Sequence, residues 1–173
     1  DMAEIEAMCA QLSTLGVDGI LLAPGYHYAT LADDHFMYRD EIHRKFARVL
    51  ALAERYPVSS TPLFLQFAAG KRDYPCTPWG NPTRTPKGWK GPCYLIEDRY
   101  YGSWSDFWKG VDWDYWESRR DPRCQNCLMH SGFEPSVMRD LGNRRGDLWT
   151  MARWMLSRPT VASSSPSSSS ASA

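Results

Sequence analysis

Four cysteines in the second half of the sequence have the types and spacing of a metal site. Cys76 is followed by eleven residues, Gly88, four residues and Cys93, and a Cys-x2-Cys pair comes later at Cys124 and Cys127. Four thiolates complete the ligand set of a tetrahedral zinc ion or of an iron–sulfur cluster, and a two-residue spacer lets both sulfurs of a turn face one centre. The sequence therefore predicts a soft-metal site at these four cysteines. The alternative is that they are separate reduced cysteines, buried as small hydrophobic residues.

Composition and charge exclude several classes of protein. The 173 residues carry 20 Lys and Arg against 20 Asp and Glu, a formal net charge of zero. No surplus of positive charge is available to neutralise phosphates, so nucleic acid is not an expected partner. No apolar run is long enough to span a bilayer, and residues 1–6 lack the pattern of a secretory signal. An odd cysteine count, with Cys9 left over as an expected core residue, fits a reducing compartment, so the expected localisation is cytoplasmic.

Residues 1–70 show the patterns of alternating helices and strands. Three-and-four spacing of apolar residues predicts a helix over 2–15 and another over 42–53, and the apolar run 17–23 predicts a strand buried on both faces. The apolar residues 63–67 are interpreted as a core helix, against the alternative of lining an apolar substrate pocket. Because the chain starts inside a helix, it is interpreted as a piece of a longer protein.

The loop after the expected strand is the place for ligand contacts in this first part. In parallel α/β folds and barrels, the loops at the carboxyl ends of the strands carry the chemistry. Here that loop runs from residue 24 to 28, and Gly25, Tyr26 and Tyr28 are the candidate substrate-binding residues. Ordinary packing of the two tyrosines is the alternative.

Residues 71–135 are rich in Pro, Gly and Trp, and they contain all four cysteines of the expected site. Residues 76–82 are expected to form consecutive turns, and Cys93–Ile96 a short strand. A loop-rich segment of this kind buries little apolar surface and needs an additional cross-link for stability, which a bound metal would supply. The aromatic stretch 104–116 is predicted to be a short helix that begins near Ser105 and packs on a core.

Residues 136–158 are expected to be helical, and residues 159–173 are a Ser-rich tail that cannot bury enough surface to order itself. Asp147 is predicted to cap a last helix. One face of that helix is expected to be buried, and its residues are Leu148, Met151, Trp154 and Met155. Only Arg153 and Arg158 add positive charge there, too little to make a strong case for a membrane-surface helix.

Several segments resemble one known family. The run Cys-Thr-Pro-Trp-Gly-Asn-Pro at 76–82 is the most specific, and residues 16–26, 91–95 and 124–134 add to the match. Over about residues 2–156 the chain resembles the radical S-adenosylmethionine (radical SAM) enzymes of hopanoid biosynthesis that make adenosylhopane. The resemblance implies an α/β fold: the carboxyl-terminal end of a partial (β/α) radical SAM barrel, followed by a loop-rich, cysteine-containing extension with short helices.

The resemblance also implies cofactors and partners. Enzymes of that family hold a 4Fe–4S cluster on a Cys-x3-Cys-x2-Cys loop, cleave S-adenosylmethionine, and add the 5′-deoxyadenosyl radical to the hopene lipid diploptene. An electron donor such as flavodoxin or ferredoxin is then expected, and peripheral membrane contact would come through the lipid substrate. In this setting the four cysteines would hold an auxiliary cluster or zinc. This sequence contains no Cys-x3-Cys-x2-Cys, so the chain alone is expected to be inactive.

One position departs from the family pattern. Ser131 stands where the family often has another cysteine, and a hydroxyl is a poor ligand for iron or zinc. His130 is then a candidate fourth donor, although a histidine beside a turn is more often solvated or hydrogen-bonded to the backbone. Two other functions stay open: a non-catalytic zinc-binding interaction module, and a radical SAM enzyme with a different substrate.

Overall fold

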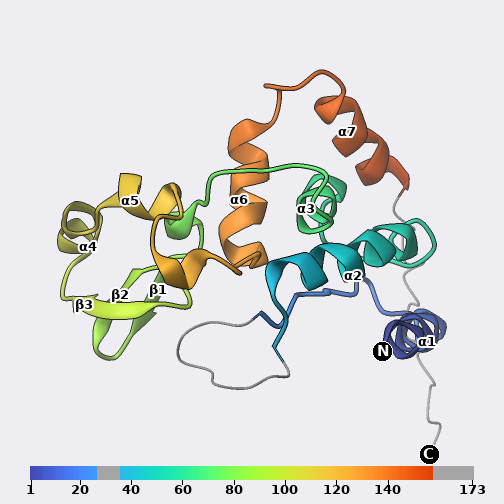
Figure 1. Cartoon of the computed structure of the whole chain (residues 1–173), viewed down its shortest axis with the longest axis horizontal. Coiled ribbons are helices and arrows are strands. Elements are labelled where there is room, and N and C mark those ends of the chain that lie inside the picture. The colour runs from blue at the N-terminus through green and yellow to red at the C-terminus, as the bar shows by residue number, and fades with distance from the viewer. Residues whose placement is uncertain (27–35, 158–173) are drawn as a thin grey trace, which may run out of the picture.

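A computed structural model describes residues 1–26 and 36–157, which form mainly helices and one small antiparallel sheet (Figure 1). The sheet and two short helices lie at one end of the molecule, and the longer helices lie at the other. Two single 3-10 turns, at Pro78–Gly80 and Pro122–Cys124, lie in the cysteine-rich segment. The helices and strands are α1 (Met2–Thr14), α2 (Arg39–Leu52), α3 (Pro62–Ala68), β1 (Thr83–Thr85), β2 (Gly88–Pro92), β3 (Glu97–Tyr101), α4 (Trp104–Gly110), α5 (Trp113–Glu117), α6 (His130–Asp140) and α7 (Asp147–Ser157).

The first helix begins and ends where its sequence predicts. Asp1 accepts a hydrogen bond from the backbone N–H of Ala3 and forms a capping box with Glu4. Gly16 follows the last turn with a φ of +74°, a conformation that favours glycine. Cys9 is fully buried, so its expected place in the core is confirmed.

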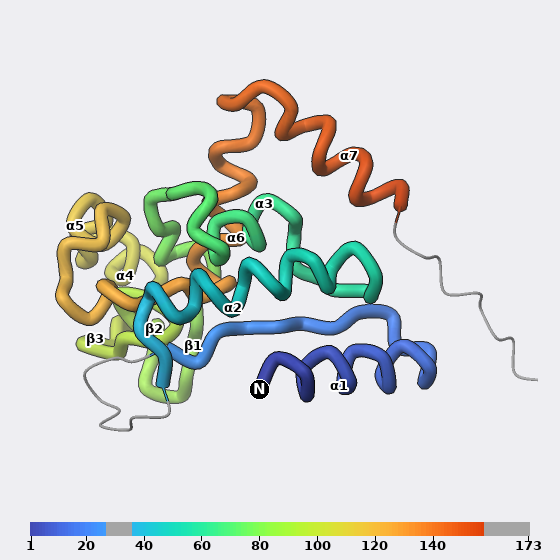
Figure 2. Tube along the Cα trace, turned by 45° about the vertical axis from the view of Figure 1, so that its right-hand side comes forward, coloured from blue at the N-terminus to red at the C-terminus, as the bar shows by residue number. Residues whose placement is uncertain are grey.

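The expected strand over 17–23 is wrong as a continuous element. The segment runs extended between α1 and α2 (Figure 2), but it pairs only through an isolated parallel bridge from Ile20 to Val58. The Ile20 N–H donates to the Pro57 carbonyl at 2.8 Å, and the Ser59 N–H donates to the Ile20 carbonyl at 3.0 Å. Leu21 is 54% exposed, so the segment is not buried on both faces. The described residues supply pairing on one side at a single point, which is too little for a strand, and they form no barrel.

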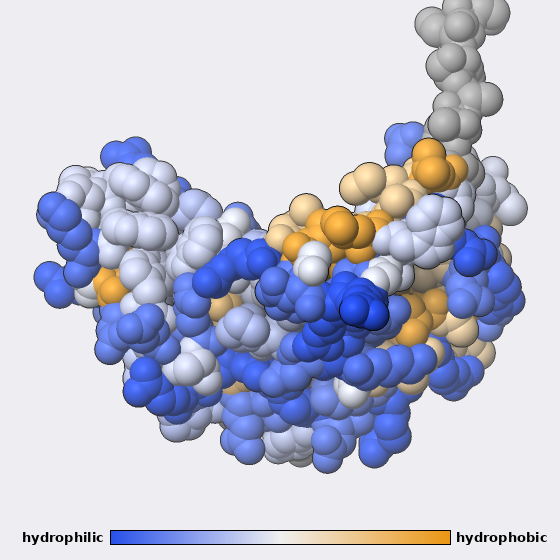
Figure 3. Space-filling view, turned by 90° about the horizontal axis from the view of Figure 1, so that it is seen from above, coloured by the Kyte–Doolittle hydropathy of each residue, from blue (hydrophilic) through white to orange (hydrophobic). Residues whose placement is uncertain are grey.

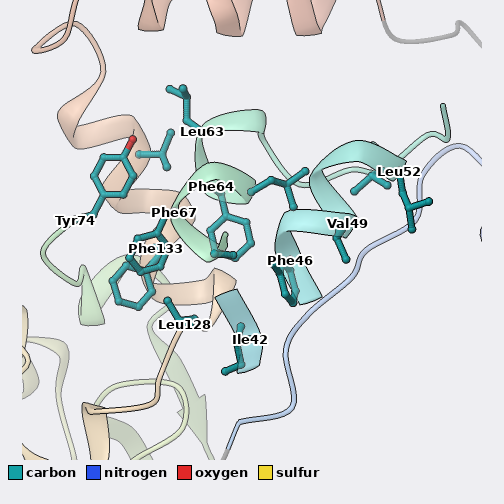
Figure 4. Packing of buried hydrophobic residues seen from close by; sticks show 14 of the residues in the cluster. Ile42, Phe46, Val49, Leu52, Leu63, Phe64, Phe67, Tyr74, Leu128 and Phe133 are labelled. Carbon is teal, nitrogen blue, oxygen red and sulfur yellow. The ribbon is translucent and has the colours of Figure 1, made fainter. Parts of the chain in front are cut away.

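The main core lies between α2, α3 and α6 (Figure 4). Ile42, Phe46 and Val49 point inward from α2, which confirms the predicted buried face of that helix. The core-helix interpretation of 63–67 is also confirmed, because α3 buries Leu63, Phe64, Leu65 and Phe67. Phe67 stacks on Phe133 of α6 with ring centroids 4.2 Å apart. Each such side chain contributes about 1.5–3 kcal/mol through removal of apolar surface from water.

The strands β1, β2 and β3 form an antiparallel sheet in that order. The predicted strand at Cys93–Ile96 is wrong, because these residues form the turn between β2 and β3. The turn is closed by the Ile96 N–H, which points at Cys93 Sγ from 3.4 Å instead of joining a strand ladder. At the start of β2, Gly88 has a φ of +123°, and a Cβ there would collide with the Tyr101 carbonyl.

The aromatic stretch forms two short helices, α4 and α5, rather than one. Phe107 is buried with Tyr101 and Val111 in a second, smaller core, and Trp89 and Trp113 pack against it. The interpretation that this stretch packs on a core is therefore confirmed for Phe107 and Trp113.

The carboxyl-terminal part differs most from expectation. The helix α6 begins at His130, so the expected boundary at 135/136 falls inside it. Asp147 does not act as the predicted cap, because its carboxylate forms an ion pair with Arg72 at 2.7 Å. The predicted buried face of α7 is half wrong: Met151 is buried, but Leu148 is 62% and Met155 61% exposed. Figure 3 shows apolar side chains gathered on the face of the molecule that carries α6 and α7.

In the part of the chain that the structure describes, no helix combines the length and the apolar character needed to cross a bilayer. The expected Ser-rich tail lies outside the described residues.

Candidate metal centre

The four cysteines of the predicted site line one pocket. Cys76, Cys93, Cys124 and Cys127 surround a cavity of about 40 Å³. They come from three separate places in the chain: the segment before the Pro78 turn, the turn after β2, and the loop between α5 and α6. All four are free thiols rather than disulfides. The structure therefore brings together residues that lie up to 51 positions apart in the sequence.

The Cys-x2-Cys turn is held from outside by the first residue of α2. Within the turn, the Cys127 N–H donates to the Cys124 carbonyl at 3.1 Å. The Arg39 side chain donates to the Gln125 carbonyl at 2.8 Å and to the Cys127 carbonyl at 3.3 Å, and its backbone N–H reaches Asn126 Oδ1 at 3.2 Å. Three hydrogen bonds from one residue fix the path of the turn, and with it the directions of both thiols.

A second arginine ties the same turn to the sheet. Arg123 donates to both carboxylate oxygens of Asp98, at 2.6 and 2.7 Å, and its Nε donates to Asp121 at 2.9 Å. Paired hydrogen bonds between a guanidinium and a carboxylate fix geometry as well as charge. Because Asp98 belongs to β3, the sheet and the Cys-x2-Cys turn are held in one arrangement.

The position of Cys76 depends on a glycine in α6. The Cys76 N–H donates to the Glu117 carbonyl at 2.9 Å. A Cβ on Gly132 would lie 2.9 Å from Cys76 Sγ, closer than ordinary van der Waals contact. With any residue larger than glycine at this position, the Cys76 sulfur or the helix would therefore have to shift.

The loop predicted to touch substrate meets the cysteine pocket. Tyr26 is buried, lines the pocket, and hydrogen-bonds through its side chain to Cys127. Gly25 precedes it, is exposed, and accepts a hydrogen bond from the Met37 N–H at 2.9 Å. Tyr28 lies outside the described residues. Substrate contact by Gly25, Tyr26 and Tyr28 stays a prediction. The structure adds a contact between Tyr26 and Cys127, one of the four candidate metal-binding cysteines.

The pocket wall is mostly apolar, and this governs the charge of the thiols. Burial raises the pKa of Cys127, and it raises the pKa of Cys124 to about 12, with the neighbouring cysteines adding to the effect. Cys76 is affected in the same direction and by the same two causes, so its pKa is also raised. Burial therefore disfavours the thiolate form in this pocket, and a bound metal centre would supply positive charge that favours it. The positive charges of Arg119 and Arg123 beside the pocket also favour the thiolates, because Arg119 lowers the pKa of Cys76 and Arg123 lowers that of Cys124.

The arrangement of the sulfurs bears on which metal would fit. Over residues 1–26 and 36–157, no group of three or more His, Cys, Asp or Glu side chains is arranged so that it could hold a metal ion. A single zinc ion, with Zn–S bonds of about 2.3 Å, would need the sulfurs roughly 3.8 Å apart. An iron–sulfur cluster keeps its thiolates farther apart, because its irons and sulfides stand between them. The donor set and its convergence on one pocket suit either a cluster or a zinc ion, and the finding that the sulfurs do not already lie at zinc spacing favours the cluster.

The alternative donor is placed elsewhere. Neither His130 nor Ser131 is part of the pocket wall, although both lie at the start of α6 beside it. His130 Nδ1 is buried without a hydrogen-bond partner among the described residues. The residues missed by the sequence interpretation are Arg39, Arg123 and Gly132, which position the cysteines through contacts that no local pattern signals.

A protein-family model matches most of the chain. The model of a family described as a domain of unknown function, DUF3463, matches residues 20–151, which include every residue of the pocket. No curated protein and no solved structure matches the chain.

Proposed function

This chain belongs to the DUF3463 family, and we propose that the shared domain is a cysteine-ligated iron–sulfur module of a radical SAM enzyme. Cys76, Cys93, Cys124 and Cys127 hold an auxiliary cluster. The observation that carries the proposal is that four free thiols from three separate chain segments line one apolar pocket.

The residues around the pocket have defined tasks in this proposal. Arg39 and Arg123 fix the Cys-x2-Cys turn, and Gly132 leaves room for the Cys76 sulfur. The Ile96 N–H at Cys93 and the Tyr26 side chain at Cys127 are hydrogen bonds to ligand sulfurs. Hydrogen bonds of this kind stabilise the more negative state of a cluster and raise its reduction potential. An iron–sulfur cluster with four cysteine ligands, when bound, would supply one-electron chemistry.

The fold around the pocket supports a place beside a radical SAM barrel. The segments at Ile20 and Val58 run parallel and pair at one point, and the chain leaves the first of them directly toward Tyr26 and the cysteines. In a (β/α) barrel the loops at this end of the strands carry the chemistry. The proposed whole enzyme adds the 5′-deoxyadenosyl radical to diploptene, as the sequence resemblance implies, with the cysteine module covering the mouth of the barrel.

Anaerobic purification followed by metal analysis tests the module. We expect iron with labile sulfide and a visible absorption band that bleaches on reduction. The variant Cys93→Ala should lose most of the iron, while Cys9→Ala, a buried cysteine on α1 outside the pocket, should keep it. Stoichiometric zinc without colour would instead support the zinc-binding interaction module, and unchanged iron in Cys93→Ala would remove that residue from the ligand set.

The substrate assignment needs its own test. The natural protein that contains this domain, reduced and supplied with S-adenosylmethionine and diploptene, should give adenosylhopane. Cleavage of S-adenosylmethionine without a lipid adduct would support a radical SAM enzyme with another substrate. No cleavage at all would sink the radical-enzyme proposal and leave the metal module standing.

A further inference from the structure

A larger polar pocket adjoins the cysteine pocket, and the function proposed above assigns no ligand to it. Its volume is about 460 Å³, within the range of small-molecule sites. Cys124 and Arg119 line both pockets, so a ligand in the larger one would lie beside the metal centre.

Positive charge dominates this second pocket. Arg39, Arg72 and Arg119 line it, and Asp73 is the acidic residue in its wall. Arg72 is already neutralised, because it forms two hydrogen bonds to the buried Asp147 carboxylate, at 2.8 and 2.7 Å. Two guanidinium groups therefore face one carboxylate.

That carboxylate holds its partner weakly. Only Nη2 of Arg119 bonds to Asp73, at 2.9 and 2.8 Å, and among the described residues its Nε and Nη1 have no hydrogen-bond acceptor. The Asp73 side chain is 70% exposed, and an ion pair as open to water as this is worth little. An incoming oxyanion could therefore take up the unused donors of Arg119.

The backbone of Arg119 supports a role for its side chain. Its φ is +56°, a left-handed conformation that follows the end of α5, where glycine is the residue of lowest cost. Non-glycine residues in this region are strained, and such strain is concentrated at functional sites. An arginine kept at this position places a guanidinium at the junction of the two pockets.

We propose that this pocket binds a small molecule through a carboxylate or phosphate group, held between Arg39 and Arg119 beside Cys124. Both groups present more than one oxygen, so one oxygen can accept from Nε or Nη1 of Arg119 and another from Nη1 of Arg39, which are the donors that the contacts above do not use. His43 forms part of the wall, and Gly70 lets the backbone pass close to it, since a Cβ there would lie 2.7 Å from His43 Nδ1.

Isothermal titration calorimetry with inorganic phosphate and with acetate, at an ionic strength held constant with chloride, tests the proposal. We expect Arg119→Gln to weaken binding at least about tenfold, the loss of one charged hydrogen-bonding group. Asp73→Asn should instead tighten binding several-fold, because it removes the competing carboxylate, and a misfolded variant cannot give this result. The matched control is Arg48→Gln, an exposed residue of α2 outside the pocket, which should bind like the unmodified protein.

The outcomes separate the explanations. Tighter binding of phosphate or of acetate identifies the group that the pocket prefers. Binding of neither anion, or equal weakening in Arg48→Gln and Arg119→Gln, would overturn the proposal. Metal content measured on the same samples keeps the two proposals apart, because Asp73 does not line the cysteine pocket and Asp73→Asn should retain its iron whether or not anions bind.

Discussion

Replacement of Gly132 by alanine separates the metal site from the stability of the fold. Gly132 lies in α6, and the added Cβ would be 2.9 Å from Cys76 Sγ, about half an ångström inside ordinary contact. Overpacking of this kind costs about 1–3 kcal/mol. Alanine in a helix is favoured over glycine by about 1 kcal/mol, which offsets part of that cost.

The net loss of unfolding free energy in Gly132→Ala is therefore expected to be at most about 2 kcal/mol. The effect on the metal centre should be much larger. Ligand atoms must stay within about 0.5 Å of productive geometry, and the clash moves the Cys76 sulfur by that amount. We expect a folded variant that has lost most of its iron.

Urea unfolding and metal analysis of the same anaerobic preparations make the measurement. Gly102→Ala is the matched control, because a Cβ at Gly102 meets nothing within 4 Å, and it should keep its iron. Full iron content in a stable Gly132→Ala protein would refute the reasoning. The Cys76 sulfur would then not need the position that the structure gives it.

Two further predictions concern the core and the buried ion pair. Hydrogen bonds from Arg72 hold the pKa of Asp147 below its usual range, so this pair stabilises the fold above about pH 4 and the contribution is lost as pH falls through the folded-state pKa. Asp147→Asn should lower stability at pH 7 by about 3–5 kcal/mol and flatten the acid side of the stability profile in thermal or urea unfolding, and an unchanged pH profile would contradict the pairing. Phe67→Ala should cost about 3–5 kcal/mol in urea unfolding, because its ring is buried against Phe133, and a loss under 1 kcal/mol would place Phe67 outside the core.

Local patterns predicted the helices that carry a single apolar stripe. The spacing of Ile42, Phe46 and Val49 identified α2, and the apolar run at 63–67 identified α3. The first part of α6, before residue 136, was missed because Gly132 and Pro135 both lower helix propensity. Burial of Phe133 and Val137 against α3 outweighs those local costs, and no sequence window of this length contains that information.

The strand prediction at 17–23 failed for a related reason. An apolar run is typical of a strand buried on both faces, but a strand exists only where a neighbour pairs with it along its length. In the described residues Ile20 finds one partner, Val58, and Leu21 points to solvent. The apolar pattern indicates that the segment can form a strand where neighbouring strands pair with it, and the described residues supply only one such pairing.

The cysteine site shows the limit of motif reasoning more sharply. Spacing alone identified the four thiols, but the contacts that aim them join residues more than eighty positions apart, as from Arg39 to Gln125 and Cys127. These contacts tie the start of α2 to the Cys-x2-Cys turn, and Tyr26 ties the preceding loop to Cys127. A metal bound by the cysteines would therefore also fix the position of Arg39 at the start of α2. A ligand that contacts Arg39 would in turn change its hydrogen bonds to the cysteine turn. Because Arg39 lines the polar pocket and also holds the cysteine turn, a ligand in one pocket is expected to alter the geometry of the other.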